Sequence, residues 1–141
     1  MPVLLFAFSI FQESELFTGK LLTDHAAVAA ARAASVVLPD NPMRYGGEGV
    51  NQPGPQRTEA VRTAAVRALA PFVHDGNVTN VEVSFPSGTP LQGPLSVRVT
   101  ATFKCKVALT SYLTCNRSGT RTLVGTATLP NQGARYTYEG G

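Results

Sequence analysis

The pattern of apolar and polar residues changes twice along this chain of 141 residues. Residues 1–11 are almost all apolar, and an alanine-rich run continues to Pro39 with no proline after Pro2. Proline suits the first turn of a helix, where its missing N–H costs nothing, and it disfavours a helical conformation in the residue before it. The pattern predicts one long helix over residues 3–38, roughly 50 Å long at 1.5 Å per residue.

A loop and a second helix are expected next. Residues 39–57 are dominated by proline, glycine and asparagine, which predicts a long loop. Thr58 can cap a helix, and the apolar residues after it recur at helical spacing until Pro71. We therefore expect a short helix over residues 58–70.

Beyond Asn77 the apolar residues alternate with polar ones, which is the period of a half-buried strand. The alternation predicts an antiparallel sheet with one apolar face and one face in water. We expect the short helix and the C-terminal half of the long helix to cover the apolar face. The expected strands are residues 78–85, 95–109, 121–129 and 134–138.

The expected fold class is therefore α+β. A long apolar N-terminal helix is followed by a small C-terminal domain with a short helix and a four-stranded antiparallel sheet. The chain divides into a membrane or filament-core helix (1–38), a Pro/Gly-rich loop (39–57) and a globular head domain (58–141). Its length suits a single domain.

The first eleven residues are apolar on every side of the predicted helix, so no face of this segment is suited to water. The segment is also shorter than the roughly 20 apolar residues that span a bilayer. If the helix is followed to Leu22, the length suffices but Glu13, Glu15 and Lys20 are included. We expect this part of the helix to lie in lipid or among copies of itself.

The two glutamates have no basic residue three or four positions away on their own helix, whereas Lys20 can pair with Asp24. An unpaired carboxylate in an apolar environment is costly. We therefore expect Glu13, Glu15 or both to pair with a cation of a neighbouring subunit, either Lys20 or the amine of Met1, and so to set the register between subunits. The alternative is that both carboxylates reach the membrane surface.

The segment "AAVAAARAA" is small on every face except at Arg32. Small residues let helices approach closely, which indicates helix packing through Ala26, Ala27, Ala30 and Ala34. The alternative is an ordinary helix of high intrinsic propensity that packs on the sheet of its own chain.

The two cysteines, Cys105 and Cys115, lie in "CKVALTSYLTC" and form no CxxC motif. One pair that closes a short loop is typical of a disulfide in an exported protein. The alternative is two reduced thiols in a cytosolic chain.

The composition gives no sign of catalysis or of nucleic-acid binding. Charged residues make up 15% of the chain, the net charge is +3, and the basic residues are scattered rather than arranged in a stripe. No phosphate-binding loop, nucleophile elbow or zinc-protease motif is present. His25 and His74 each adjoin an aspartate, but adjacent residues of a helix point apart. We expect no enzyme, no metal and no cofactor.

The order of these features resembles a known family. The stretches "PVLLF" and "DHAAVAAARAA", the Pro/Gly loop and the strands that end in "TLVGTATLPNQGARYTY" resemble the TadE/TadG-like proteins of tight-adherence (Flp-type) pilus systems. More broadly they resemble type IV pilin-like and pseudopilin subunits. The resemblance implies a structural subunit that polymerises through its N-terminal helix into an extracellular filament on a bacterial surface.

The resemblance also implies partners. These are copies of the chain itself, the inner membrane before assembly, the pilus assembly machinery and a prepilin peptidase. Mature chains of the family usually carry a glutamate at the fifth position; here Leu5 stands there and no leader precedes Met1, so either processing has occurred or Met1 is a late start. Glu13 or Glu15 would then take the registering role. The alternatives are a minor pseudopilin or assembly factor kept in the inner membrane, and a membrane-anchored module that binds a surface.

Overall fold

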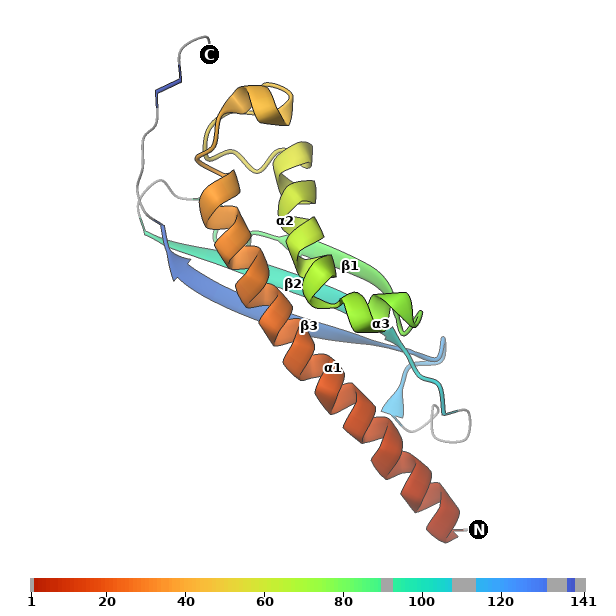
Figure 1. The fold of residues 1–141 in the computed structure, drawn as a ribbon. Coiled ribbons are helices and arrows are strands. Elements are labelled where there is room, and N and C mark those ends of the chain that lie inside the picture. Colours follow the sequence, from red (N-terminus) through yellow and green to blue (C-terminus); the bar gives the residue numbers. More distant parts are fainter. Residues whose placement is uncertain (1, 90–92, 108–113, 132–136, 139–141) are drawn as a thin grey trace.

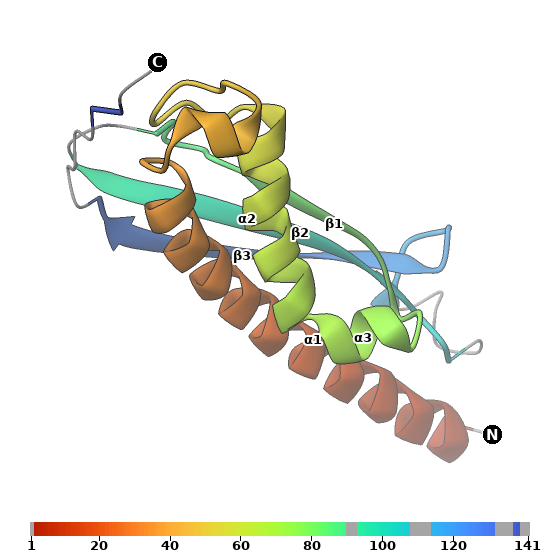
Figure 2. The ribbon, with the colours of Figure 1, turned by 45° about the horizontal axis from the view of Figure 1, so that its top comes forward.

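The computed structural model describes residues 2–89, 93–107, 114–131 and 137–138. A single long helix, α1 (Pro2–Val37), precedes a three-stranded antiparallel sheet, and the shorter helices come between them in sequence. Figures 1 and 2 show the helices on one face of the sheet, with the first turns of α1 reaching beyond the strands. The α+β class and the long N-terminal helix are confirmed.

Helix α1 has 36 residues and is about 54 Å long. It ends at Val37, one residue before the predicted boundary, and Leu38 still donates its N–H to the Ala34 carbonyl at 3.0 Å. The terminal carbonyls of a helix need donors from elsewhere. Arg57 supplies them, because its guanidinium donates to the carbonyls of Val37 and Asp40.

The predicted second helix begins earlier than expected, because α2 spans Pro55–Ala68. Thr58 is therefore not its N-cap. The carboxylate of Glu48 caps the helix from the preceding loop, accepting the N–H groups of Gln56 at 2.6 Å and Arg57 at 3.0 Å. Pro71 does not end a helix either, since it lies in the first turn of a further short helix, α3 (Ala70–His74). The loop before α2 also contains a 3-10 turn, η1 (Pro42–Tyr45).

The sheet has the order β1-β2-β3 and consists of β1 (Val78–Ser84), β2 (Pro94–Lys104) and β3 (Thr120–Pro130). The prediction of four strands is wrong for the described residues. The expected strand 134–138 falls partly on residues 132–136, which lie outside them, and residues 137–138 are not in a strand. Strand β2 stops at Lys104 rather than at residue 109, because the chain turns towards the disulfide; residues 108–109 also lie outside the described part.

The core lies between the sheet and the helices α1 and α2. Strand β2 alternates as expected, with buried side chains at every second position. Its central position in the sheet explains why this strand carries the most regular pattern. The inward-facing residues are Leu95, Val97, Val99, Ala101 and Phe103.

The four alanines named above, Ala26, Ala27, Ala30 and Ala34, are all fully buried within the chain. They lie in the part of α1 that packs on α2, β2 and β3. Their packing is therefore intramolecular, as in the alternative interpretation, and within this fold they offer no surface to another subunit.

Two glycines allow α1 to cross the sheet at close range. A Cβ at Gly125 of β3 would lie 2.8 Å from the carbonyl carbon of Thr23 and 3.0 Å from Cα of Asp24. A Cβ at Gly19 of α1 would lie 2.8 Å from a ring carbon of Phe103. All three distances are shorter than ordinary van der Waals contacts, so these two positions limit how closely the helix packs on the strands.

Candidate interaction surface

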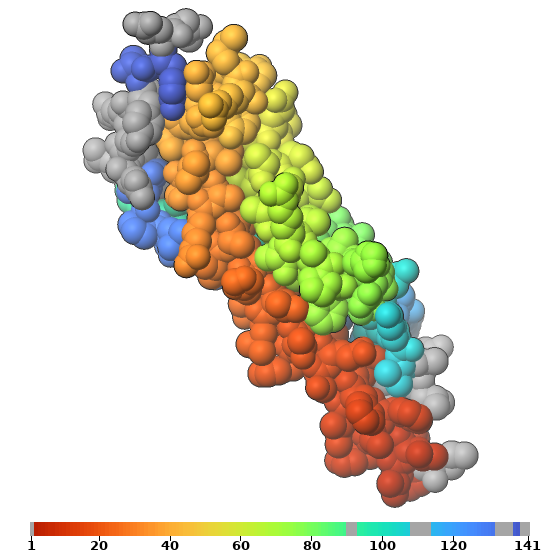
Figure 3. Space-filling view, viewed as in Figure 1, coloured from red at the N-terminus to blue at the C-terminus, as the bar shows by residue number. Residues whose placement is uncertain are grey.

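The first ten described residues of α1, 2–11, form what is called here the N-terminal segment. It contains no charged residue, and its large apolar side chains are exposed, with Val3 77% and Phe6 70% accessible. Figure 3 shows this end of the helix reaching beyond the rest of the molecule. Exposed apolar surface of this extent marks a site of protein or membrane contact.

The apolar surface continues along one side of α1 as an outer stripe, defined as Val3, Phe6, Ile10, Phe17 and Leu21. At about 100° per residue these positions share one side of the helix, opposite the buried side. Within the N-terminal segment, Leu4 and Phe11 are exposed on yet another side. Residues 2–11 are thus apolar all round, whereas further along α1 the exposed large apolar side chains are Phe17 and Leu21 of the stripe and Val36 near the C-terminal end.

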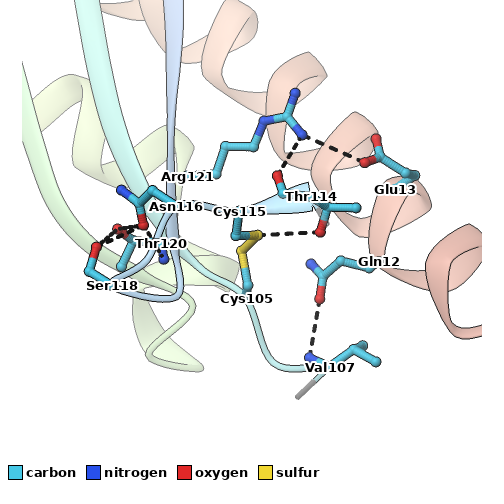
Figure 4. The surroundings of a disulfide bond; sticks show 10 residues. All are labelled: Gln12, Glu13, Cys105, Val107, Thr114, Cys115, Asn116, Ser118, Thr120 and Arg121. Carbon is cyan, nitrogen blue, oxygen red and sulfur yellow. Dashed lines mark hydrogen bonds and ion pairs between the residues drawn. A yellow bond between two sulfur atoms is a disulfide. The ribbon is translucent and has the colours of Figure 1, made fainter. Parts of the chain in front are cut away.

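Gln12 is the first residue of α1 whose side chain is buried. This side chain is only 1% exposed, and its Oε1 accepts the N–H of Val107 at 3.1 Å. Leu16 and Gly19, the next residues on the same side, are buried as well. The buried face of α1 therefore begins at Gln12, which Figure 4 shows beside Val107.

Glu13 has a partner in its own chain that is not on its own helix. Nη1 of Arg121 on β3 lies 3.6 Å from Oε1 of Glu13 and donates to the Thr114 carbonyl at 3.0 Å. Figure 4 shows Arg121 between these two acceptors. Glu13 was expected to pair with a cation of a neighbouring subunit; within the subunit a sheet residue distant in sequence, Arg121, already lies within ion-pair distance of it.

The other residues expected to set the register differ in whether they have an ion-pair partner within the chain. Lys20 pairs with Asp24, as the four-residue spacing predicts. Glu15 is exposed and makes no ion pair with any residue in the described part of the chain. Met1 lies outside the described residues. Of the predicted register carboxylates, Glu15 remains the one without an intrachain cation among those residues.

A groove of about 470 Å³ runs between α1 and β3 beside these ion pairs. Leu16 and Leu123 are buried at its base, while Phe17 is exposed at its edge. We call it the α1–β3 groove. It is lined by Glu13, Leu16, Phe17, Lys20, Arg121, Thr122, Leu123 and Val124.

Cys105 and Cys115 form a disulfide, as predicted. The bond joins the segment that follows β2 to the segment that precedes β3, ten residues apart in sequence. It therefore closes the loop whose ends carry Val107 and Thr114, the residues that meet Gln12 and Arg121. The disulfide therefore constrains the segment that contains Val107, whose N–H donates to Gln12 of α1 (Figure 4).

Arg57 fixes the opposite end of α1, and no sequence pattern indicated that this residue lies in the core. Arg57 is fully buried and its guanidinium also donates to the Glu48 carbonyl at 3.0 Å. The same group lies 4.5 Å from the centre of the Tyr45 ring. The carbonyls at the end of a helix need hydrogen-bond donors from elsewhere in the chain. This general requirement is the only signal from which a buried donor such as Arg57 could have been expected.

Asp40 and Tyr45 form a polar cluster next to this arginine. The N–H of Asn41 donates to the carboxylate of Asp40 at 2.7 Å, and this hydrogen bond, with the nearby Arg44, lowers the pKa of Asp40. Burial, together with the neighbouring Asp40 carboxylate, raises the pKa of Tyr45. Both shifts stabilise the ordinary charge states of these groups, so the cluster is suited to holding the loop rather than to transferring protons.

In the described ranges, no helix combines the length and the apolar character that a bilayer crossing requires. In those same ranges, no three His, Cys, Asp or Glu side chains come together as a metal site would need. No protein-family model, curated protein or solved structure matches this chain.

Proposed function

We propose that this protein is a pilin-like structural subunit. It polymerises through its N-terminal helix into an extracellular filament on a bacterial surface, with the sheet domain on the outside. Before assembly it resides at the inner membrane, where a prepilin peptidase and the pilus assembly machinery act on it. The resemblance to TadE/TadG-like and pilin-like proteins supports this proposal.

The observation that carries the proposal is the uncharged N-terminal segment at the end of an anchored helix. Its apolar side chains face every direction, so one neighbouring helix cannot cover them all. Burial of apolar surface contributes about 25 cal/mol per Å². A bundle of such helices, each surrounded by several others, covers the segment on all sides.

Glu15 takes the registering role in this proposal. It lies four residues after the end of the N-terminal segment, and Glu13 and Lys20 already have intrachain partners. In a bundle, the carboxylate of Glu15 pairs with a cation of a neighbour and so fixes the axial offset. Glu15→Gln is expected to lower the filament yield without affecting the fold of the subunit.

Electron microscopy of the purified full-length chain tests the function. The double variant Phe6→Asp, Ile10→Asp should abolish filaments, because burying unpaired charge is costly. Val36→Asp is the matched control, since Val36 is an equally exposed apolar residue at the other end of α1. Uniform filaments from wild type and control, with none from the double variant, are expected. Absence of wild-type filaments, or normal filaments from the double variant, would refute the proposal.

A further inference from the structure

The α1–β3 groove combines an apolar base with charges that are already compensated. Glu13 pairs with Arg121 across the groove, and Lys20 pairs with Asp24 along α1. An occupant therefore needs no charge of its own to neutralise the groove. A charged occupant would instead compete with two existing ion pairs, which favours a neutral and apolar one.

The N-terminal segment has this chemistry. It carries no charged residue and presents several large apolar side chains to solvent. The volume of the groove, about 470 Å³, lies within the roughly 300–1,000 Å³ of pockets that bury a ligand of drug size. Several side chains from one face of a helix fit into such a volume.

The segment cannot occupy the groove of its own chain. It belongs to the same continuous helix as Glu13, Leu16 and Lys20, which line the groove, and it leads away from them. Only another molecule can bring residues 2–11 beside residues 13–20.

We propose that the α1–β3 groove of one subunit is the docking site for the N-terminal segment of a second copy. This inference rests on the proposed function and gives the subunit contact a specific location. The outer stripe supports it, because Phe17 at the edge of the groove continues the line of Val3 and Ile10 at intervals of seven residues. Two helices that are displaced along their axes can thus match apolar side chains over their whole overlap.

The proposed contact is heterologous, since the segment and the groove are different surfaces of one chain. Contacts of this kind leave one free segment and one free groove at the ends and so produce open-ended assemblies. The offset between the centres of the two surfaces is about ten residues, on the order of 15 Å along the helix axis. A closed antiparallel pair would satisfy two grooves but leave Leu4 and Phe11 uncovered on a further side of the helix.

Disulfide cross-linking of the full-length chain tests the contact. Phe6→Cys marks the segment and Phe17→Cys marks the groove, while Cys105 and Cys115 are already joined to each other. A mixture of the two single variants should form cross-linked 6–17 pairs on mild oxidation. The double variant should form a ladder of covalent multimers, because each molecule links to one neighbour on either side.

The outcomes separate this inference from the proposed function. A ladder supports the docking site, whereas covalent dimers alone would indicate a closed pair and overturn it. Filaments without 6–17 cross-links would also overturn it while leaving the proposed function intact. Neither filaments nor cross-links from these chains and the wild type would refute both.

A variant of the groove gives an independent readout. Phe17→Glu should raise the critical concentration for assembly at least about tenfold, and Val36→Glu should leave it unchanged. Val36 is a matched control for Phe17, because the two side chains lie on the same helix and are 68% and 67% exposed. Equal effects of the two substitutions would count against the groove.

Discussion

Replacing Glu13 by glutamine separates what the ion pair with Arg121 contributes to the subunit from what it contributes to the assembly. In the subunit, Glu13 is 56% and Arg121 44% exposed, and their charged atoms are 3.6 Å apart. Exposed pairs of this kind contribute about 0.2–1 kcal/mol. We therefore expect Glu13→Gln to lower the free energy of unfolding of the subunit by at most about 1 kcal/mol.

In the proposed assembly the same pair would lie under the N-terminal segment of a neighbour and would lose its contact with water. Removing one partner of a buried pair costs about 3–5 kcal/mol, because the other charge is left uncompensated. Glutamine can still accept a hydrogen bond from Arg121, so the lower end of this range applies. Since about 1.4 kcal/mol corresponds to a factor of ten, the critical concentration should rise about a hundredfold.

Urea denaturation of the dispersed subunit and sedimentation of filaments at increasing concentration measure the two quantities. Glu59→Gln serves as the control, because Glu59 forms a comparable exposed pair with Arg62 at 2.8 Å on α2, away from the groove. The reasoning is refuted if Glu13→Gln destabilises the subunit by more than about 2 kcal/mol. It is equally refuted if the critical concentrations of the two variants agree.

Three further predictions concern the support of α1. Gly125→Ala should destabilise the subunit by about 1–3 kcal/mol, because the methyl group meets the backbone of α1; Gly49→Ala, which meets only a flexible glutamine side chain, is the control in urea denaturation. Arg57→Met should cost about 3–5 kcal/mol in the same assay, because buried carbonyls lose their donor, and a cost below about 1 kcal/mol would contradict it. Deleting residues 1–11 should leave a folded monomer by circular dichroism and sedimentation, since the buried face of α1 starts at Gln12.

The sequence predicted the long helix because its limits are local. Pro2 and Pro39 act on the residues next to them, and the alanine-rich run between them has few alternatives to a helix. The start of α2 was harder to predict from the sequence, because its cap comes from Glu48 in the loop and not from the residue at the helix start. A side chain that reaches over several residues leaves no pattern at the position it caps.

The number of strands was also hard to predict from local sequence alone. The alternation in 134–138 is only five residues long, and so short a run does not reveal whether it has a neighbouring strand. Tyr138 instead donates its hydroxyl to the carbonyl of Pro39 at 2.8 Å, at the C-terminal end of α1. The longer alternation of β2 predicted its inward face correctly, because eleven residues in a central strand allow little ambiguity.

Partners within a helix could be predicted, and partners between elements could not. The spacing of Lys20 and Asp24 was enough to foresee their pair, whereas the pair of Glu13 and Arg121 depends on where β3 crosses α1. That crossing is fixed by Gly125, whose missing side chain lets the strand and the helix approach. A glycine in a strand thus permits the close approach between α1 and β3, the two elements that carry Glu13 and Arg121. If the N-terminal segment of a second copy occupies the α1–β3 groove, the register of the assembly depends on how closely a helix packs on a sheet within each subunit.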